Sequence, residues 1–195
     1  MGEPLSLSMG RPPEVTQAPP TAAVVDFDDL YRREFSRIAA VVHSLVGRRD
    51  VAEEITQDAF VITHDRWRRI SGYAQPADFV RRVAINRAMS SLRRRSAERR
   101  ALDRLTGRRA PATDRDDLDH PLWVEVRKLP ARQAQAIALT YVDDLPIERV
   151  AVVLECSVNT VKTHLKRGRA ALAAALGELH TQDVQDEQDE KDDER

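Results

Sequence analysis

Apolar residues recur every three or four positions along most of the chain, a period that predicts α-helices. Valine, isoleucine and threonine do not alternate with polar residues over any long stretch, so the pattern of strands is missing. A first helix is predicted over residues 28–45, and Gly47 follows its last apolar residue, where a glycine commonly ends a helix. The inward face of this helix comprises Leu30, Phe35, Ile38 and Val42. We therefore expect an all-α protein.

Two further helices are predicted before residue 100. The first covers residues 50–67 with Asp50 as its N-cap, and a loop over residues 68–75 separates it from a long helix that begins at Pro76. The apolar stripe of helix 50–67 comprises Ala52, Ile55, Ala59 and Ile62. Its opposite face presents Asp50, Glu53, Glu54, Gln57, Asp58 and Val61. The long helix is expected to turn inward Ala77, Val80, Val83, Ala84, Ala88 and Leu92.

The second half of the chain contains the clearest local motif. A short amphipathic helix over residues 147–154 is followed by the turn Glu155-Cys156-Ser157, in which Ser157 is placed to cap the next helix. That helix should bury Val158, Val161, Leu165 and Leu172. Its other side carries no carboxylate and presents Asn159, Thr160, Lys162, Thr163, His164, Lys166, Arg167 and Arg169. This arrangement predicts a helix-turn-helix whose second helix enters a major groove; an amphipathic hairpin with a solvated basic face is the alternative.

Composition divides the chain into five parts. Residues 1–25 contain five prolines and few large apolar side chains, which is typical of a disordered leader. Residues 26–100 and 121–179 hold the helical patterns and are predicted to form two small domains. Residues 101–120 lack apolar periodicity and should form a flexible linker, whereas residues 180–195 should form a disordered acidic tail.

The net charge of −1 conceals a strong separation of charge along the chain. Between Arg81 and Arg109 there are eleven arginines and two acidic residues, and between Glu178 and Arg195 there are nine acidic residues against two basic ones. Such a separation favours one surface made for a polyanion. The single cysteine, Cys156, excludes an intramolecular disulfide, and no apolar run approaches the length of about 20 residues that crosses a bilayer. The chain also has no secretion signal, so we expect no membrane insertion and a cytoplasmic location.

Several of these segments resemble a known family, the extracytoplasmic-function sigma factors of the sigma-70 type. The segments similar to the family's C-terminal domain are Leu129–Gln133, Pro146–Ala151 and Ser157–Lys162. Ala52–Phe60 resembles the segment with which the family grips RNA polymerase, and Val83–Ala88 with Leu92–Arg95 resembles its promoter-melting helix. The resemblance covers about residues 27–95 and 120–177, in the family's order.

The resemblance implies a sigma factor that binds core RNA polymerase and directs promoter-specific initiation, with an anti-sigma factor as a further partner and no cofactor. The polymerase-binding residues would be Asp50, Glu53, Glu54, Gln57, Asp58 and Val61. Melted minus-ten bases would be captured by Tyr73, Phe79, Arg82 and Asn86. The phosphates of that strand would be held by Arg81, Arg87, Arg93, Arg94 and Arg95. The minus-35 duplex would be read by Ser157, Asn159, Thr160, Lys162, Thr163, His164, Lys166 and Arg167.

Four positions depart from the family's usual pattern: His64, Phe79, Ser90 and Glu155. At Glu155 the family usually has glycine, and a positive φ would cost a glutamate about 1–2 kcal/mol.

Two other classes of protein compete with the sigma factor. An enzyme is disfavoured because the five histidines are scattered and no glycine-rich phosphate loop occurs. A dimeric helix-turn-helix regulator that binds duplex DNA without polymerase would leave the acidic face at residues 53–58 and the arginine-rich helix at residues 81–95 unexplained.

Overall fold

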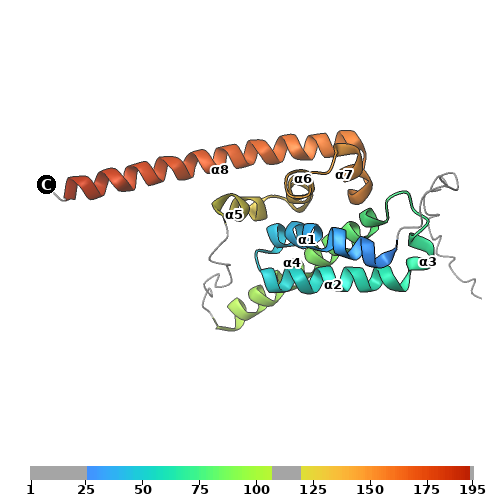
Figure 1. The fold of residues 1–195 in the computed structure, drawn as a ribbon. Helices are drawn as coiled ribbons and strands as arrows, with labels where there is room; N and C mark the ends of the chain where they lie inside the picture. Colours follow the sequence, from blue (N-terminus) through green and yellow to red (C-terminus); the bar gives the residue numbers. More distant parts are fainter. Residues whose placement is uncertain (1–25, 107–119, 194–195) are drawn as a thin grey trace, which may run out of the picture.

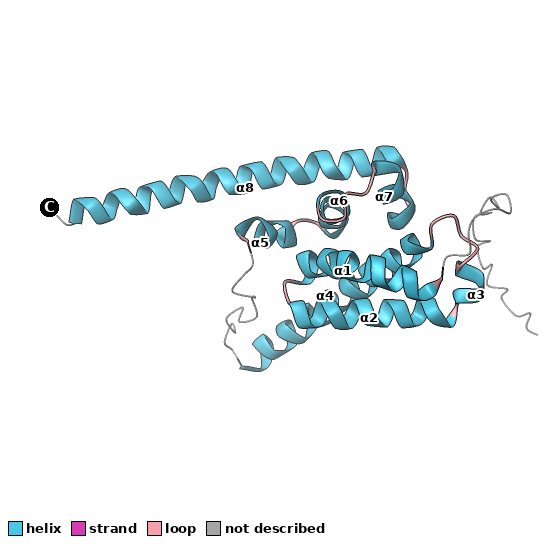
Figure 2. Ribbon diagram, viewed as in Figure 1, coloured by secondary structure: helices cyan, strands magenta, loops and turns pink. Residues whose placement is uncertain are grey.

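The computed structural model describes residues 26–106 and 120–193, and every regular element in these two ranges is an α-helix (Figures 1 and 2). The prediction of an all-α protein is therefore confirmed. The predicted leader and most of the predicted linker lie outside the described residues. The helices are α1 (Phe27–Val46), α2 (Arg49–Asp65), α3 (Trp67–Ile70), α4 (Pro76–Thr106), α5 (Pro121–Lys128), α6 (Ala131–Tyr141), α7 (Ile147–Leu154) and α8 (Val158–Asp193).

Helices α1, α2 and α4 pack on one another and, with α3, make up the N-terminal half of the structure (Figure 1). Their contact is built from the predicted stripes, whose most buried members include Leu30, Ile38, Ala59 and Val80, each with no more than 1% of its surface exposed. Gly47 ends α1 as predicted: its φ of 73° lies in the left-handed region, and its backbone N–H donates to the carbonyl of His43 at 2.8 Å.

Some boundaries differ from the predictions. Helix α2 begins at Arg49, so Asp50 lies in its first turn and is not the N-cap; its carboxylate accepts a hydrogen bond from Arg48 at 3.1 Å. The first residues of the predicted loop over residues 68–75 are helical and belong to α3. Ile70, the last residue of this helix, is completely buried in the core. Helices α4 and α8 continue beyond the predicted ends at residues 100 and 179. No glycine or proline occurs between residues 178 and 193 to end the backbone helix of α8.

The C-terminal half, α5–α8, forms a second group of helices around Val126, Leu139, Val150 and Val161, all completely buried. Helix α8 lies along the outside, with α5, α6 and α7 between it and the N-terminal half (Figure 1). Helix α8 crosses α6 closely at Gly168: a Cβ atom there would lie 2.7 Å from Cδ1 of Ile137, so the end of that side chain would have to shift.

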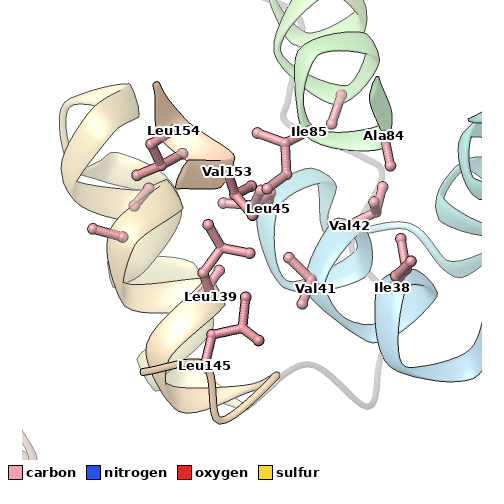
Figure 3. Close-up of a cluster of buried hydrophobic side chains, with 14 of the residues drawn as sticks. Ile38, Val41, Val42, Leu45, Ala84, Ile85, Leu139, Leu145, Val153 and Leu154 are labelled. Carbon is pink, nitrogen blue, oxygen red and sulfur yellow. The ribbon is translucent and has the colours of Figure 1, made fainter. Parts of the chain in front are cut away.

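The two halves are docked on each other. Helix α1 packs against α5 and α6, and α4 packs against α7. In the close-up of this contact, Leu139, Leu145 and Val153 from the C-terminal half lie against Val41 and Leu45 of α1 (Figure 3). One continuous apolar core thus runs through both halves. The sequence predicts two domains on a linker and contains no signal for this contact.

Candidate nucleic-acid and protein interfaces

The turn between α7 and α8 positions the predicted recognition helix. Glu155 ends α7 with a φ of 53°, which is the left-handed conformation that the sequence predicts for this position. The Oγ atom of Ser157 accepts a hydrogen bond from the backbone N–H of Thr160 at 3.1 Å and lies 2.8 Å from its hydroxyl oxygen. The predicted cap is therefore confirmed, and Ser157 and Thr160 together fix the direction in which α8 leaves the turn.

The polar face of α8 is open to solvent. Val161, Leu165 and Leu172 anchor the opposite face, each with 8% or less of its surface exposed. Thr160 and His164 are half-buried at the edges of the polar face. Its exposed members are Asn159, Lys162, Thr163, Lys166, Arg167 and Arg169. The structure therefore presents the predicted minus-35 residues together on one outward helix face, with donors suited to phosphates and base edges.

The predicted polymerase face of α2 is also exposed along its whole length. Val61, an apolar residue with 58% of its surface exposed, lies at the C-terminal end of this face, after the acidic positions. Three of the acids have partners in the chain: Asp50 pairs with Arg48, Glu53 with Arg49 at 2.9 Å, and Asp58 with Arg87 of α4 at 3.4 Å. The exposed residues of this face are Asp50, Glu53, Glu54, Gln57, Asp58 and Val61.

At the start of α2, Asp50 lies beside a basic neighbour, Arg48. The hydrogen bond from Arg48 is the main cause that lowers the pKa of Asp50 below its ordinary value. Beside this face, a cavity of about 340 Å³ lies between α2 and α4; Glu54, Asp58 and Arg87 are among its lining residues. The lining combines these two carboxylates with three arginines of α4, so the cavity presents charges of both signs.

Three of the predicted minus-ten residues meet where the loop before α4 joins that helix. The rings of Tyr73 and Phe79 lie edge to face with their centroids 6.5 Å apart, and the guanidinium carbon of Arg82 lies 5.5 Å from the centroid of Phe79. This cluster does not face open solvent: Phe79 is only 8% exposed, and Arg82 forms an ion pair with Glu155 at 2.7 Å. The cluster thus forms one wall of a cavity of about 970 Å³ between α4 and the α7–α8 turn.

The remaining minus-ten residues follow along α4. Asn86, Arg87, Arg93 and Arg94 are exposed, and Arg95 is half-buried. Arg93 donates to the hydroxyl of Ser90 at 3.0 Å, so Ser90, which departs from the family's usual pattern, helps to hold an arginine. The exposed arginines form a basic track that begins close to the Tyr73–Phe79 cluster.

Arg81 differs from its neighbour Arg82. Its side chain is buried, with 3% of the residue exposed, and it donates hydrogen bonds to Glu34 at 2.7 Å and to Asp143 at 3.1 Å. Burial alone would lower the pKa of Arg81, but its bonds to the two carboxylates outweigh this and raise it, so the guanidinium stays charged. The prediction that Arg81 holds DNA phosphates is wrong for this arrangement of the two halves.

Metal sites and membrane spans are both absent from the part of the chain that the structure describes. Within residues 26–106 and 120–193, no three histidine, cysteine, aspartate or glutamate side chains are grouped so that they could hold a metal ion. None of the helices in these ranges has the length and apolar character of a membrane span.

Comparison with known proteins gives matches over both halves. The family description "Sigma-70 region 2" matches residues 30–98, and "Sigma-70, region 4" matches residues 121–172. An RNA polymerase sigma-E factor of Streptomyces antibioticus is 27% identical over 162 residues, covering 83% of this chain and 88% of the relative. The ECF RNA polymerase sigma factor SigW of Bacillus subtilis is 26% identical over 172 residues, covering 80% of this chain and 90% of the relative.

A solved structure has the same fold. The sigma factor RpoE of Bartonella quintana, in complex with the anti-sigma factor NepR, superposes with a TM-score of 0.63 at 21% sequence identity. The alignment covers 78% of this chain and 97% of that one. At this level of identity, the comparison supports the arrangement of helices and does not transfer individual residues.

Proposed function

The chain belongs to the extracytoplasmic-function sigma factors of the sigma-70 family, and we propose that it directs RNA polymerase to promoters through three separate surfaces. A sigma factor supplies positioning and sequence specificity, so we assign no catalytic residue to this chain. The polymerase would carry out the nucleotide chemistry.

The exposed face of α8 would read the minus-35 element as duplex DNA. Lys166 and Arg167 would neutralise phosphates, while Asn159 in the first turn would reach base edges in the major groove. The observation that carries this role is that the face is free of carboxylates and mostly exposed, on a helix whose direction is fixed by the Ser157 cap. Affinity from the phosphate contacts should fall steeply with salt concentration.

The exposed acidic face of α2 would bind core polymerase. Glu53, Glu54 and Asp58 would set the orientation and rate of association with a basic partner, and Val61 would supply apolar contact. The cavity between α2 and α4 lies beside this face, so a bound polymerase segment would also approach the basic track of α4.

The cluster of Tyr73, Phe79 and Arg82 would capture melted bases of the minus-ten element. Extruding a base from the duplex costs a few kcal/mol, and a binding pocket with aromatic rings and a guanidinium can recover that energy by stacking. The arginines that follow on α4 would hold the backbone of the captured strand.

An anti-sigma factor is a further proposed partner. The structural relative RpoE is solved in complex with one, NepR. We propose that this chain is also controlled by such a protein.

A gel-shift experiment with and without core polymerase tests the proposed function. We expect stable, sequence-specific complexes on a promoter fragment only when core polymerase and the chain are both present. Specific complexes of equal strength without polymerase would instead indicate a self-sufficient duplex-binding regulator.

A further inference from the structure

A small cavity at the N-terminal end of α4 is lined by four arginines. Its volume is about 340 Å³, which lies within the size range of sites that bind small molecules. The backbone of residues 74–77, which leads into the first turn of α4, lines the same cavity. The arginines come from three helices: Arg33 and Arg37 from α1, Arg81 from α4 and Arg149 from α7. We call this cavity the arginine cavity.

The arginines of this cavity have more donors than the protein has acceptors for them. Within residues 26–106 and 120–193, the Nη1 atom of each of the four has no hydrogen-bond partner. The carboxylates that do bind these arginines are Glu34, Asp78 and Asp143. Four positive charges therefore meet three negative ones, and one positive charge has no acidic partner in the cluster.

The buried member of the four, Arg81, indicates that a ligand is missing. Its side chain is only 4% exposed, yet its Nη1 atom lacks an acceptor in the described part of the chain. The carboxylate oxygen of Asp78 is 3.8 Å from this atom, which is beyond hydrogen-bond distance. A buried donor without an acceptor is destabilising, and more so when the group is charged. An anion in the cavity would compensate the excess charge.

The acidic residue in the lining does not oppose an anion. One carboxylate oxygen of Glu34 accepts a hydrogen bond from Nε of Arg33 at 3.0 Å, and the other accepts from Nη2 of Arg81 at 2.7 Å. Both oxygens are thus held by positive groups. Helix α4 adds to the positive potential, because the N-terminal end of this 31-residue helix carries a partial positive charge and Pro76 and Ala77 lie at the cavity.

Three of the four arginines are accessible from solvent. The side chains of Arg33 and Arg37 are 58% and 52% exposed, and that of Arg149 is 28% exposed. Their free nitrogens belong to two different helices, so a ligand with oxygens on several sides fits them better than a planar carboxylate does. The tetrahedral phosphate group has this shape, and arginine is well suited to bind it.

We propose that the arginine cavity binds the phosphate group of a small molecule, which is either inorganic phosphate or a phosphate ester such as a nucleotide. Arg33, Arg37 and Arg149 hold the phosphate oxygens, and the N-terminal end of α4 stabilises the negative charge. This site is separate from the three surfaces of the proposed function, and none of these three arginines belongs to them.

The Arg33→Gln variant of the full chain tests this site, with Arg32→Gln as its matched control. Both arginines are exposed and adjacent on α1, and each loses its charge to a side chain of similar polarity. Arg32 pairs with Asp28 and Asp29 of the same helix and does not line the cavity. Inorganic phosphate and ADP are titrated separately by isothermal calorimetry at constant ionic strength, and circular dichroism checks the fold.

We expect the parent to bind one phosphate per chain and Arg33→Gln to bind it about tenfold more weakly, because a charge-assisted hydrogen bond is lost. Arg32→Gln should stay within about twofold of the parent. Phosphate should also raise the thermal unfolding midpoint of the parent more than chloride at equal ionic strength, and this difference should shrink in Arg33→Gln.

A second variant, Arg37→Gln, places the bound phosphate independently, and it should also weaken phosphate binding about tenfold. Tighter binding of ADP than of phosphate would support a nucleotide as the ligand, whereas equal affinities would support the phosphate group alone.

Two results would overturn the arginine cavity as a phosphate site. If neither phosphate nor ADP binds the parent, water alone fills the cavity. If binding is unchanged in both Arg33→Gln and Arg37→Gln, the phosphate binds another basic surface, such as the polar face of α8. Neither measurement uses promoter DNA or polymerase, so the failure of this proposal and the failure of the proposed function are distinguishable.

Discussion

The two proposed DNA-reading surfaces of this sigma factor, on α8 and at the start of α4, are both basic helix faces, but they stand in different environments. The face of α8 is anchored by an apolar stripe on one side and meets only solvent on the other. The start of α4 packs against the C-terminal half, and two adjacent arginines there differ in burial. Arg81 is buried in an ion-pair cluster, whereas Arg82 is partly exposed and pairs with Glu155 at the edge of the contact.

This comparison shows that positive charge alone does not make an arginine available to DNA. An arginine is unavailable where an acidic partner from elsewhere in the fold already binds its side chain. At Arg81 two buried carboxylates do so, whereas the polar face of α8 contains no carboxylate of its own. The predictions below test this difference in order of decreasing effect.

The largest effect is expected from removing the buried arginine. Arg81→Ala would leave the carboxylates of Glu34 and Asp143 buried with one partner fewer each, and it should lower the free energy of unfolding by about 3–5 kcal/mol. Urea unfolding followed by circular dichroism measures this change. Arg167→Ala, on the exposed face of α8, is the control and should leave stability unchanged within about 0.5 kcal/mol. Equal stability losses in both variants would remove the distinction between the two arginine environments.

On α8, the substitution of Asn159 separates base reading from phosphate binding. Asn159→Ala should relax discrimination at one or two upstream base pairs by about 1–3 kcal/mol, because a bidentate base contact is lost. Arg167→Ala should instead weaken binding to all promoters and lower the salt slope by about one. Competition binding with a set of single-base promoter variants measures both. If neither variant alters binding, then this face does not read DNA.

The acidic face of α2 provides a test of polymerase binding. Reversal of charge in the double variant Glu54→Lys, Asp58→Lys should slow association with core polymerase by about tenfold, since charges at an interface rim act mainly on the association rate. Both residues are exposed, so the circular dichroism spectrum should not change. Surface-plasmon measurement with immobilised core enzyme gives the rate. Unaltered association would place the polymerase contact elsewhere.

The smallest effect concerns the cap of the recognition helix. Ser157→Ala removes the acceptor for the backbone N–H of Thr160 and should cost about 1 kcal/mol of stability. Ser157→Asp keeps an acceptor at the cap and should retain the stability while weakening DNA binding through its negative charge. Thermal unfolding combined with duplex binding distinguishes the two variants. If both variants lose stability and DNA binding to the same extent, the cap does not contribute to stability separately from DNA binding.

Local features of the structure could be predicted from the sequence because their causes are local. The helical period identifies α1, α2 and α4, and Gly47 ends α1 as predicted. The three-residue turn before α8 was also predictable, with Glu155 in the left-handed conformation and Ser157 as the cap. Each of these depends on residues within a few positions of one another.

The docked interface could not be predicted in the same way. Arg81 meets Asp143 across 62 positions and Glu34 across 47, and no local pattern links such partners. One local signal did point to the burial of Arg81: it lies four residues after Ala77 and three before Ala84, on the buried stripe of α4. An arginine on an apolar stripe predicts a buried ion pair, although it does not identify the acid.

Transcription by core RNA polymerase on genomic fragments, with and without this chain, tests the central claim most directly. Start sites mapped to the nucleotide should be discrete, should require the chain, and should share sequence elements near positions −10 and −35. The Asn159→Ala variant should change which of these sites are used without abolishing transcription. An identical set of transcripts with and without the chain would contradict the assignment of these surfaces to promoter recognition.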